Sequence, residues 1–162
     1  HIPHISVPTT VKLVAKNREN MPFSISCGAT PHHLFLNTEM MQNPTDMELK
    51  VNPPIRSKKS ANELLELLKN GQIDWIETDH APHTLENKRF KQASGIPGLP
   101  LWPHIPTLLK NEGLSNSIIE NLTHNNIEKC FNFAIPRINS TKNTNLFNEY
   151  PINAYGHLVK SL

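Results

Sequence analysis

The sequence lacks the features that mark several large classes of protein. It contains no run of 18 apolar residues, the length that a membrane-spanning helix needs. With a net charge of +2 and 6% aromatic residues, it has no basic stripe with interleaved aromatics of the kind that binds nucleic acid. Its two cysteines, Cys27 and Cys130, lie far apart, so no disulfide framework is expected. We therefore expect a cytoplasmic protein without nucleic-acid or membrane partners.

The length and composition are those of a globular domain. The 162 residues are 37% hydrophobic and 19% charged, which is enough apolar material for one core. The sequence opens on His1 rather than methionine, so we expect a piece of a longer protein. We divide it into a folded part, residues 1–135, and a polar C-terminal tail region, residues 136–162, because the stretch NSTKNTNLFNEY has no useful periodicity.

Three short segments have the character of β-strands, near residues 2–5, 22–27 and 73–77. Segments with helical spacing of apolar residues separate them. This alternation predicts an α/β fold with a parallel sheet. In such sheets and barrels, ligands bind at the C-terminal ends of the strands.

The helices are predicted from apolar spacing and from capping residues. Thr9 or Thr10 is a suitable cap for the first. The second begins at the capping box SANE, residues 60–63, continues through a stripe of four leucines and ends at Gly71. A Gly- and Pro-rich loop is expected over residues 84–102, followed by two further helices.

Histidines gather where the predicted strands end. They are His4 at the end of the first strand, His32 and His33 after the second, and His80 and His83 after the third. Asp79 lies beside the last pair, in the heptapeptide ETDHAPH. Zinc accepts neutral imidazole and carboxylate oxygen as ligands, and a carboxylate also transfers protons. The alternative for His32 and His33 is a structural role in the turn before the apolar LFL.

Four motifs, in the order TPHHLFL, VNPPIRS, TDHAPH and GIPGLP, resemble those of dihydroorotases in the amidohydrolase superfamily. The likeness extends from His1 to about residue 135. It implies that the chain forms the C-terminal portion of a (β/α)8 barrel of the TIM type. It also implies a centre of two Zn2+ ions per complete site at the strand ends.

The resemblance implies roles for individual residues. His4 would bind one zinc ion, and Asp79 would bind the other and act as general base and acid. Substrate-binding positions are implied at Asn52, His83, Ser94 and Gly95. The implied reaction is the reversible cyclisation of N-carbamoyl-L-aspartate to dihydroorotate in pyrimidine biosynthesis.

The chain departs from the family pattern in three respects. The early His-x-His pair, the bridging carboxylate and a further histidine of the binuclear centre have no counterpart in these residues. Glu77 stands where small residues are usual, and Gly28 stands where some relatives carry an acid. Because a stable zinc site needs three or four ligands, we expect this chain alone not to hold the full centre.

Three interpretations remain open. In the first, which we favour, the chain belongs to an active dihydroorotase, with a homodimer as one arrangement, and the missing N-terminal part of the barrel completes the site. In the second, it is a catalytically inactive dihydroorotase-like subunit that scaffolds another pyrimidine enzyme, such as aspartate transcarbamoylase. In the third, it is a piece of another amidohydrolase.

Overall fold

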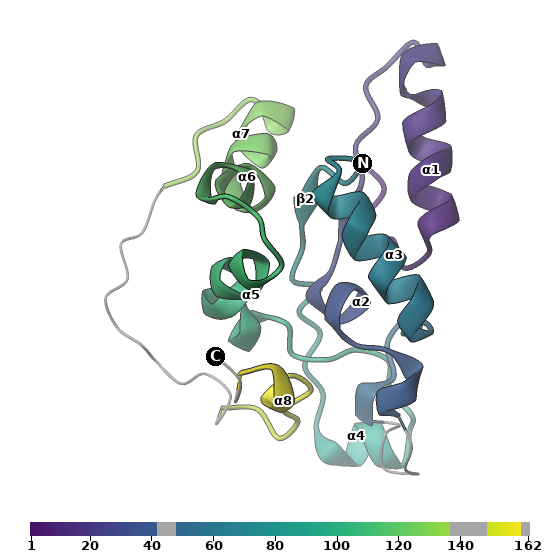
Figure 1. The fold of residues 1–162 in the computed structure, drawn as a ribbon. Coiled ribbons are helices and arrows are strands. Elements are labelled where there is room, and N and C mark those ends of the chain that lie inside the picture. Colours follow the sequence, from purple (N-terminus) through teal and green to yellow (C-terminus); the bar gives the residue numbers. More distant parts are fainter. Residues whose placement is uncertain (42–47, 137–148, 160–162) are drawn as a thin grey trace.

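A computed structural model describes residues 1–41, 48–136 and 149–159 of the chain (Figure 1). Helices lie on both sides of a short central strand region, with α1, α2 and α3 on one side and α5, α6 and α7 on the other. The elements in chain order are α1 (Pro8–Asn17), the 3₁₀ turn η1 (Arg18–Asn20), β1 (Gly28–Ala29), α2 (Pro31–Phe35), the 3₁₀ turn η2 (Thr38–Met40), α3 (Lys58–Lys69), β2 (Trp75–Ile76), α4 (Leu85–Arg89), the 3₁₀ helix η4 (Leu99–His104), α5 (Ile105–Asn111), α6 (Asn116–Glu120), the π-helical turn η5 (Asn121–Asn125), α7 (Asn126–Phe131) and α8 (Gly156–Val159).

Parallel pairing organises the strand region. β1 pairs with β2, with Gly28 opposite Trp75. Just before β1, an isolated parallel bridge joins Ile2 to Cys27, and this bridge is all that the described residues form of the strand predicted near residues 2–5. The parallel direction confirms the prediction from the alternating pattern. The second strand, however, begins just beyond the predicted range 22–27, because the ladder to β2 forms only where that segment enters the core.

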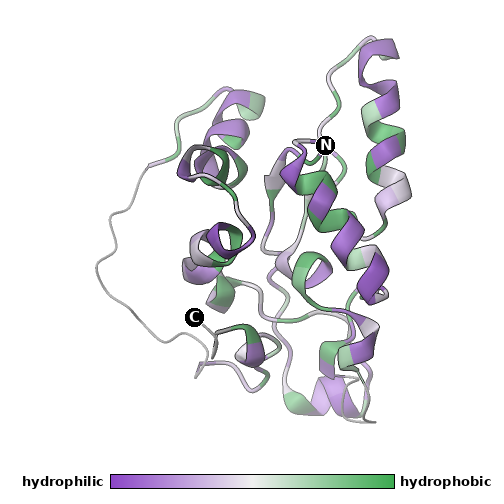
Figure 2. Ribbon diagram, in the orientation of Figure 1, coloured by the Kyte–Doolittle hydropathy of each residue, from purple (hydrophilic) through white to green (hydrophobic). Residues whose placement is uncertain are grey.

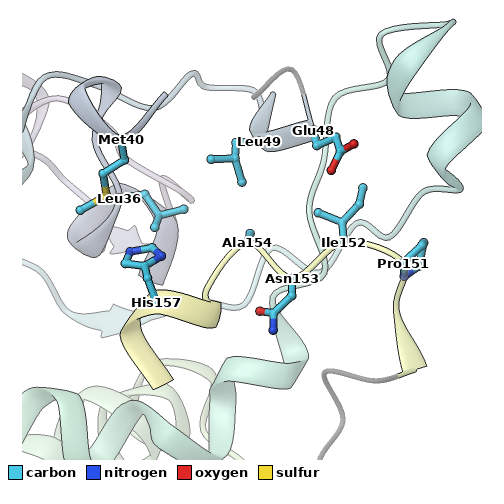
Figure 3. A pocket seen from close by; sticks show the side chains of 9 residues that line it. All are labelled: Leu36, Met40, Glu48, Leu49, Pro151, Ile152, Asn153, Ala154 and His157. Atoms are coloured by element: carbon cyan, nitrogen blue, oxygen red, sulfur yellow. The ribbon is translucent and has the colours of Figure 1, made fainter. Parts of the chain in front are cut away.

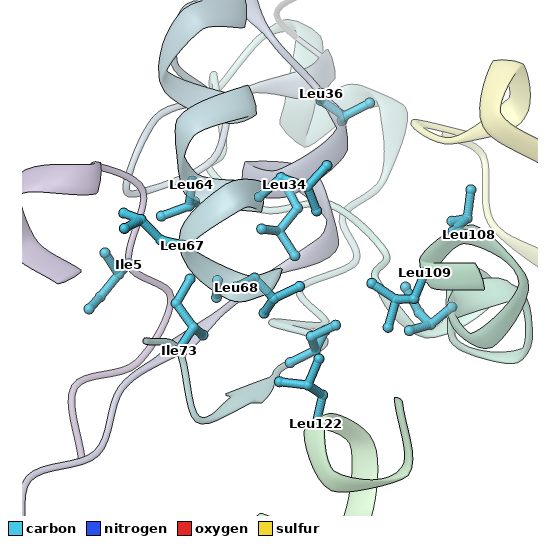
Figure 4. Packing of buried hydrophobic residues seen from close by; sticks show 14 of the residues in the cluster. Ile5, Leu34, Leu36, Leu64, Leu67, Leu68, Ile73, Leu108, Leu109 and Leu122 are labelled. Carbon is cyan, nitrogen blue, oxygen red and sulfur yellow. The ribbon is translucent and has the colours of Figure 1, made fainter. Parts of the chain in front are cut away.

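The leucine stripe of α3 forms the centre of the core, as predicted. Leu64 and Leu68 are fully buried. Figure 4 shows Leu68 close to Ile73 on one side, with Leu109 of α5 approaching from the other. Each such side chain contributes about 1.5–3 kcal/mol when it leaves water. Figure 2 shows the polar residues of α3 interleaved with these apolar ones along the helix.

Two helix starts differ from the sequence prediction. No side-chain cap bond precedes α1, which begins at Pro8, so Thr9 and Thr10 lie inside the helix. Proline needs no cap there, because its fixed φ and missing N–H suit the first turn. α3 begins before the predicted capping box, and the Ser57 hydroxyl accepts a hydrogen bond from the amide of Ser60 at 3.3 Å.

The predicted loop over residues 84–102 contains helical structure that composition did not reveal. Thr84 caps the short helix α4 by accepting a hydrogen bond from the amide of Asn87. The 3₁₀ helix η4 then begins at Leu99, inside the Pro-rich segment. Proline is compatible with the first positions of a helix, so a high proline content did not exclude one.

The tail region predicted over residues 136–162 is described only in part, since residues 137–148 and 160–162 lie outside the described ranges. Within residues 149–159, the side chains of Ile152, Ala154 and Tyr155 are buried. The division at residue 135 therefore stays a prediction. Across the described ranges, no helix has the length and apolar character to cross a bilayer.

Candidate active site at the strand ends

His4 is the extra residue of a β-bulge beside β1. The amide of Gly28 donates to the carbonyl of Ile2 at 3.0 Å, and the amide of Ile5 donates to the carbonyl of Gly28 at 2.9 Å. A regular parallel ladder would use the amide one residue earlier, at His4. His4 instead has a φ of 40°, in the left-handed region. Bulges redirect a side chain at the end of a strand, and here the redirected residue is the predicted ligand.

Asp79 has the same kind of backbone at the end of β2. Its φ is 43°, and its side chain is 29% exposed. Burial raises the pKa of the Asp79 carboxyl; the neighbouring His4 lowers it, and the nearby Glu77 carboxylate raises it. His4 and Asp79 thus lie at the same edge of the sheet, close enough to influence each other electrostatically.

His32 provides a buried neighbour for Asp79 that sequence reasoning did not assign. Its side chain is fully buried in α2, and its Nε2 lies 3.6 Å from Oδ2 of Asp79 without a hydrogen-bond partner. Its Nδ1 lies 3.3 Å from the hydroxyl of Tyr155. Burial lowers the pKa of His32 well below its usual value, so the ring is neutral at pH 7. The recurrence of histidine at strand ends was the signal for this residue.

His33, the next residue, has a structural environment. Its Nδ1 is 2.7 Å from the hydroxyl of Thr30, and its Nε2 is 2.8 Å from the carbonyl of Pro53. Burial lowers the pKa of His33 to about 4. The N-cap of α2 is Thr30, so the two histidines lie inside a buried helix rather than in a capping turn.

The four predicted substrate-binding residues lie together in a second cluster. The amide nitrogen of the Asn52 side chain donates to the Ser94 hydroxyl at 3.1 Å, and Nε2 of His83 donates to the Ser94 carbonyl at 3.0 Å. Gly95 has a φ of 135°. A Cβ there would lie 2.6 Å from the Cβ of Ala81 and 3.0 Å from Nε2 of His83, so glycine is required for both conformation and space.

Lys88 holds the backbone of this cluster and was not predicted. It is fully buried, and its Nζ donates to the carbonyl of Lys50 at 2.7 Å and to the carbonyl of Gly95 at 2.8 Å. The segments that carry Asn52 and Ser94 are thereby joined through one ammonium group. Burial lowers the pKa of Lys88 to about 8. A lysine in a segment predicted to be a loop gives no sequence signal for such a role.

The donor set does not fit a complete metal centre. His4 and Asp79 offer an imidazole and a carboxylate, which are ligand types that zinc accepts. Over the described residues, however, no three or more His, Cys, Asp or Glu side chains are grouped as metal ligands. Two donors fall short of the three or four of a stable zinc site.

A pocket of about 280 Å³ lies apart from both clusters. Figure 3 shows the C-terminal segment forming one wall and the segments around η2 forming the other. It contains none of the predicted site residues; its lining consists of Leu36, Met40, Glu48, Leu49, Pro151, Ile152, Asn153, Ala154 and His157.

Similarity to known proteins agrees with the motifs. The chain is 42% identical over 96 residues to the dihydroorotase of Brevibacillus brevis, which covers 59% of this chain and 21% of that protein. It is 43% identical over 89 residues to the dihydroorotase of Caldanaerobacter subterraneus, covering 55% and 20%. The chain spans about a fifth of the length of these curated relatives. No family model matches it.

Solved structures share the fold. An L-hydantoinase from Arthrobacter aurescens has a TM-score of 0.70 and 28% identity, over 80% of this chain and 30% of that chain. A dihydroorotase from Campylobacter jejuni has a TM-score of 0.65 and 21% identity, over 83% and 38%. The matched portion corresponds to part of an amidohydrolase barrel. These likenesses confirm the resemblance inferred from the motifs: over part of its length the chain is similar in sequence to curated dihydroorotases, and solved hydantoinase and dihydroorotase structures share its fold.

Proposed function

We propose that this chain is part of a cytoplasmic dihydroorotase, which interconverts N-carbamoyl-L-aspartate and dihydroorotate in pyrimidine biosynthesis. The observation that carries the proposal is the arrangement at the sheet edge. His4 and Asp79 both leave their strands on left-handed backbone, beside the buried His32, in a chain with dihydroorotase homologues. Strained backbone of this kind is common at functional sites.

Asp79 is the proposed catalytic residue. In the hydrolytic direction, water attacks the ring amide carbonyl, a C–O bond forms and the C–N bond breaks. Asp79 accepts the proton of the water and returns it to the leaving nitrogen. Burial raises the pKa of Asp79, which brings it nearer the working pH and makes the carboxylate a stronger acceptor for the proton of the water. The neighbouring His32 ring is neutral, so it does not form an ion pair with the Asp79 carboxylate.

The loop cluster is the proposed substrate-binding region. His83 is the proposed partner of the substrate carboxylate. Asn52 contacts the ring, and Ser94 and Gly95 contribute the loop that lies against it. The support for this set is its proximity, since Asn52 and His83 both hydrogen-bond to Ser94.

His4 and Asp79 are the proposed contributions of this chain to a centre of two Zn²⁺ ions, one ligand to each ion. The remaining ligands would come from the rest of the intact protein, the N-terminal part of the barrel, and a homodimer is one arrangement for it. The donors among the described residues of this chain are too few for a centre. The proton transfer assigned to Asp79 uses its own carboxylate.

The test is an assay of the intact protein on dihydroorotate, hydantoin and dihydrouracil, with the reverse cyclisation of N-carbamoyl-L-aspartate followed in parallel. We expect dihydroorotate to be preferred, because only this substrate carries the carboxylate that His83 is proposed to bind. Preferential turnover of hydantoin or dihydrouracil would instead indicate another amidohydrolase.

A second candidate is an inactive subunit that scaffolds aspartate transcarbamoylase. An intact protein without turnover on any of these substrates, which forms a stoichiometric complex with purified aspartate transcarbamoylase in analytical ultracentrifugation, would support it. Turnover of dihydroorotate without that partner would exclude it.

A further inference from the structure

The carboxylate of Glu77 occupies the space where a side chain on Gly28 would lie. A Cβ built on Gly28 would come 2.0 Å from Oε1 and 2.5 Å from Cδ of Glu77, far closer than the Cβ of any side chain approaches a non-bonded atom. Gly28 is not among the residues with positive φ, so its conformation does not demand glycine. Glycine is needed at this position because the Glu77 carboxylate fills the space that a side chain would take. Glu77 itself stays in the strand ladder, where its amide donates to the carbonyl of Ala29 at 3.0 Å.

This carboxylate reaches the bulge at His4. Its Oε2 accepts a hydrogen bond from the backbone amide of His4 at 3.0 Å, and its Oε1 contacts Nε2 of His1. The bulge takes the His4 amide out of the ladder, and the preceding residue, Pro3, has no N–H to offer. Glu77 therefore supplies the acceptor that the neighbouring strand does not.

The ring of His1, which contacts the Glu77 carboxylate, also packs against a second residue of the β2 segment. It stacks on Trp75 of β2, with ring centroids 4.2 Å apart and planes 18° apart. The segment that carries His4 is thus attached to β2 across the intervening strand β1, through contacts that pass over Gly28.

We infer that Glu77 is the positioning residue for His4, and that it acts as a pair with Gly28. Glycine leaves a gap over β1, Glu77 reaches through it from β2, and the carboxylate fixes the left-handed turn of the bulge. The role of His4 as a metal ligand rests on the proposed function, whereas the pairing of Glu77 with Gly28 rests only on the contacts described above. Glu77 has no assigned contact with substrate; it acts through the backbone of His4.

The first experiment is a double-mutant cycle on the unfolding midpoint of the intact protein. Gly28→Ala alone should lower the midpoint by several degrees, because its Cβ displaces the carboxylate. In the Glu77→Ala background the same change should have little effect, because the space is then free. Effects that simply add would overturn the pairing. As a control, Gly28→Ala combined with Glu66→Ala, an exposed acid of α3, should be additive.

The second experiment moves the acid to the other strand. Glu77→Ala should speed hydrogen exchange at the His4 amide and lower turnover about 10–100-fold with little change in the Michaelis constant, as expected for a displaced site residue. Gly28→Asp combined with Glu77→Ala returns a carboxylate to the same space from β1 and should restore slow exchange and much of the turnover. Glu77→Gln keeps an acceptor and should fall between the two.

Exchange at His4 that is the same in Glu77→Ala and in the unchanged protein would overturn the inference. Because exchange is read without substrate, this outcome is separate from the proposed function. If the protein turns over no dihydroorotate but exchange responds as described, the proposed function fails and the positioning role stands.

Discussion

Two regions of the molecule bring candidate residues together by different means. At the strand ends, His4 and Asp79 are placed by parallel backbone pairing above the leucine core. In the loop cluster, Asn52 and His83 are joined through Ser94, without a strand between them. The strand-end residues therefore depend on many cooperative contacts, whereas the loop residues depend on a few hydrogen bonds.

The difference predicts where each region is vulnerable. At the strand ends the fold should survive the loss of one side-chain contact, because the core holds most of the backbone in place, even where a site residue shifts. The loop cluster is supported by the Nζ of Lys88, which joins two chain segments, and by the hydrogen bond from the amide of Gly95 to the carbonyl of Lys50. At the strand ends, the largest losses of activity should come from replacing the reactive groups themselves. In the loop cluster, the largest losses of stability should come from replacing the residue that holds the backbone, Lys88.

The largest expected effect is that of Asp79→Asn on catalysis. The amide is nearly isosteric and still forms hydrogen bonds, so the fold should persist. It accepts no proton, so turnover should fall by about 10²–10⁴. Steady-state kinetics of the intact protein on dihydroorotate measure the turnover. The unfolding midpoint is the control for the fold. Near-normal turnover would assign Asp79 a structural role, and the strand ends would then no longer differ from the loop cluster in carrying the reactive group.

Lys88→Met should have the next largest effect, on stability. It leaves the buried carbonyl of Gly95 without its donor, at a cost of about 1–3 kcal/mol, whereas the carbonyl of Lys50 keeps the hydrogen bond from the amide of Gly95. Denaturant unfolding measures the loss. Lys91→Met, at an exposed lysine three residues further along the chain, is the matched control and should change little. Equal effects of the two substitutions would mean that the loop cluster does not depend on Lys88.

The same residue predicts a pH dependence. Burial lowers the pKa of Lys88 from 10.5 to about 8, so between these values the unfolded chain holds a proton that the folded chain has released. The free energy of unfolding should therefore rise with pH across that window, relative to Lys88→Met. Parallel pH profiles for the two proteins would contradict this, since other groups titrate equally in both.

His83→Ala should raise the Michaelis constant for dihydroorotate. It removes a proposed partner of the substrate carboxylate, and a hydrogen bond to a charged group contributes about 1.5–3 kcal/mol. Turnover should change less, because binding that is equal in the ground and transition states appears in the Michaelis constant. Zinc content, read by elemental analysis, should not change. Loss of zinc would place His83 among the ligands instead.

Asn52→Ala should have the smallest effect. Its hydrogen bond to Ser94 is partly solvent-exposed and contributes about 0.5–1.5 kcal/mol at most. We expect a small rise in the Michaelis constant and an unfolding midpoint close to that of the unchanged protein. A large loss of stability would show that the loop cluster is held by Asn52 as well as by Lys88.

Much of the fold was predictable because its signals are local. The alternation of strands and helices gave the parallel pairing, and the stripe of leucines in α3 gave the core. The helix starts were less predictable, because Pro8 and Ser57 each compete with nearby residues that look equally suitable. Short helices such as α4 were missed because composition reports only average preference.

By itself, the sequence determined the motifs, the order of elements and the recurrence of histidine at strand ends, since these depend on residues close together in the chain. Only the tertiary structure decided that Glu77 fills the space above Gly28, that His32 lies beside Asp79, and that Lys88 binds two distant carbonyls. The physical reason is that each contact joins segments separated along the chain. No local preference specifies which side chain a folded neighbour will meet.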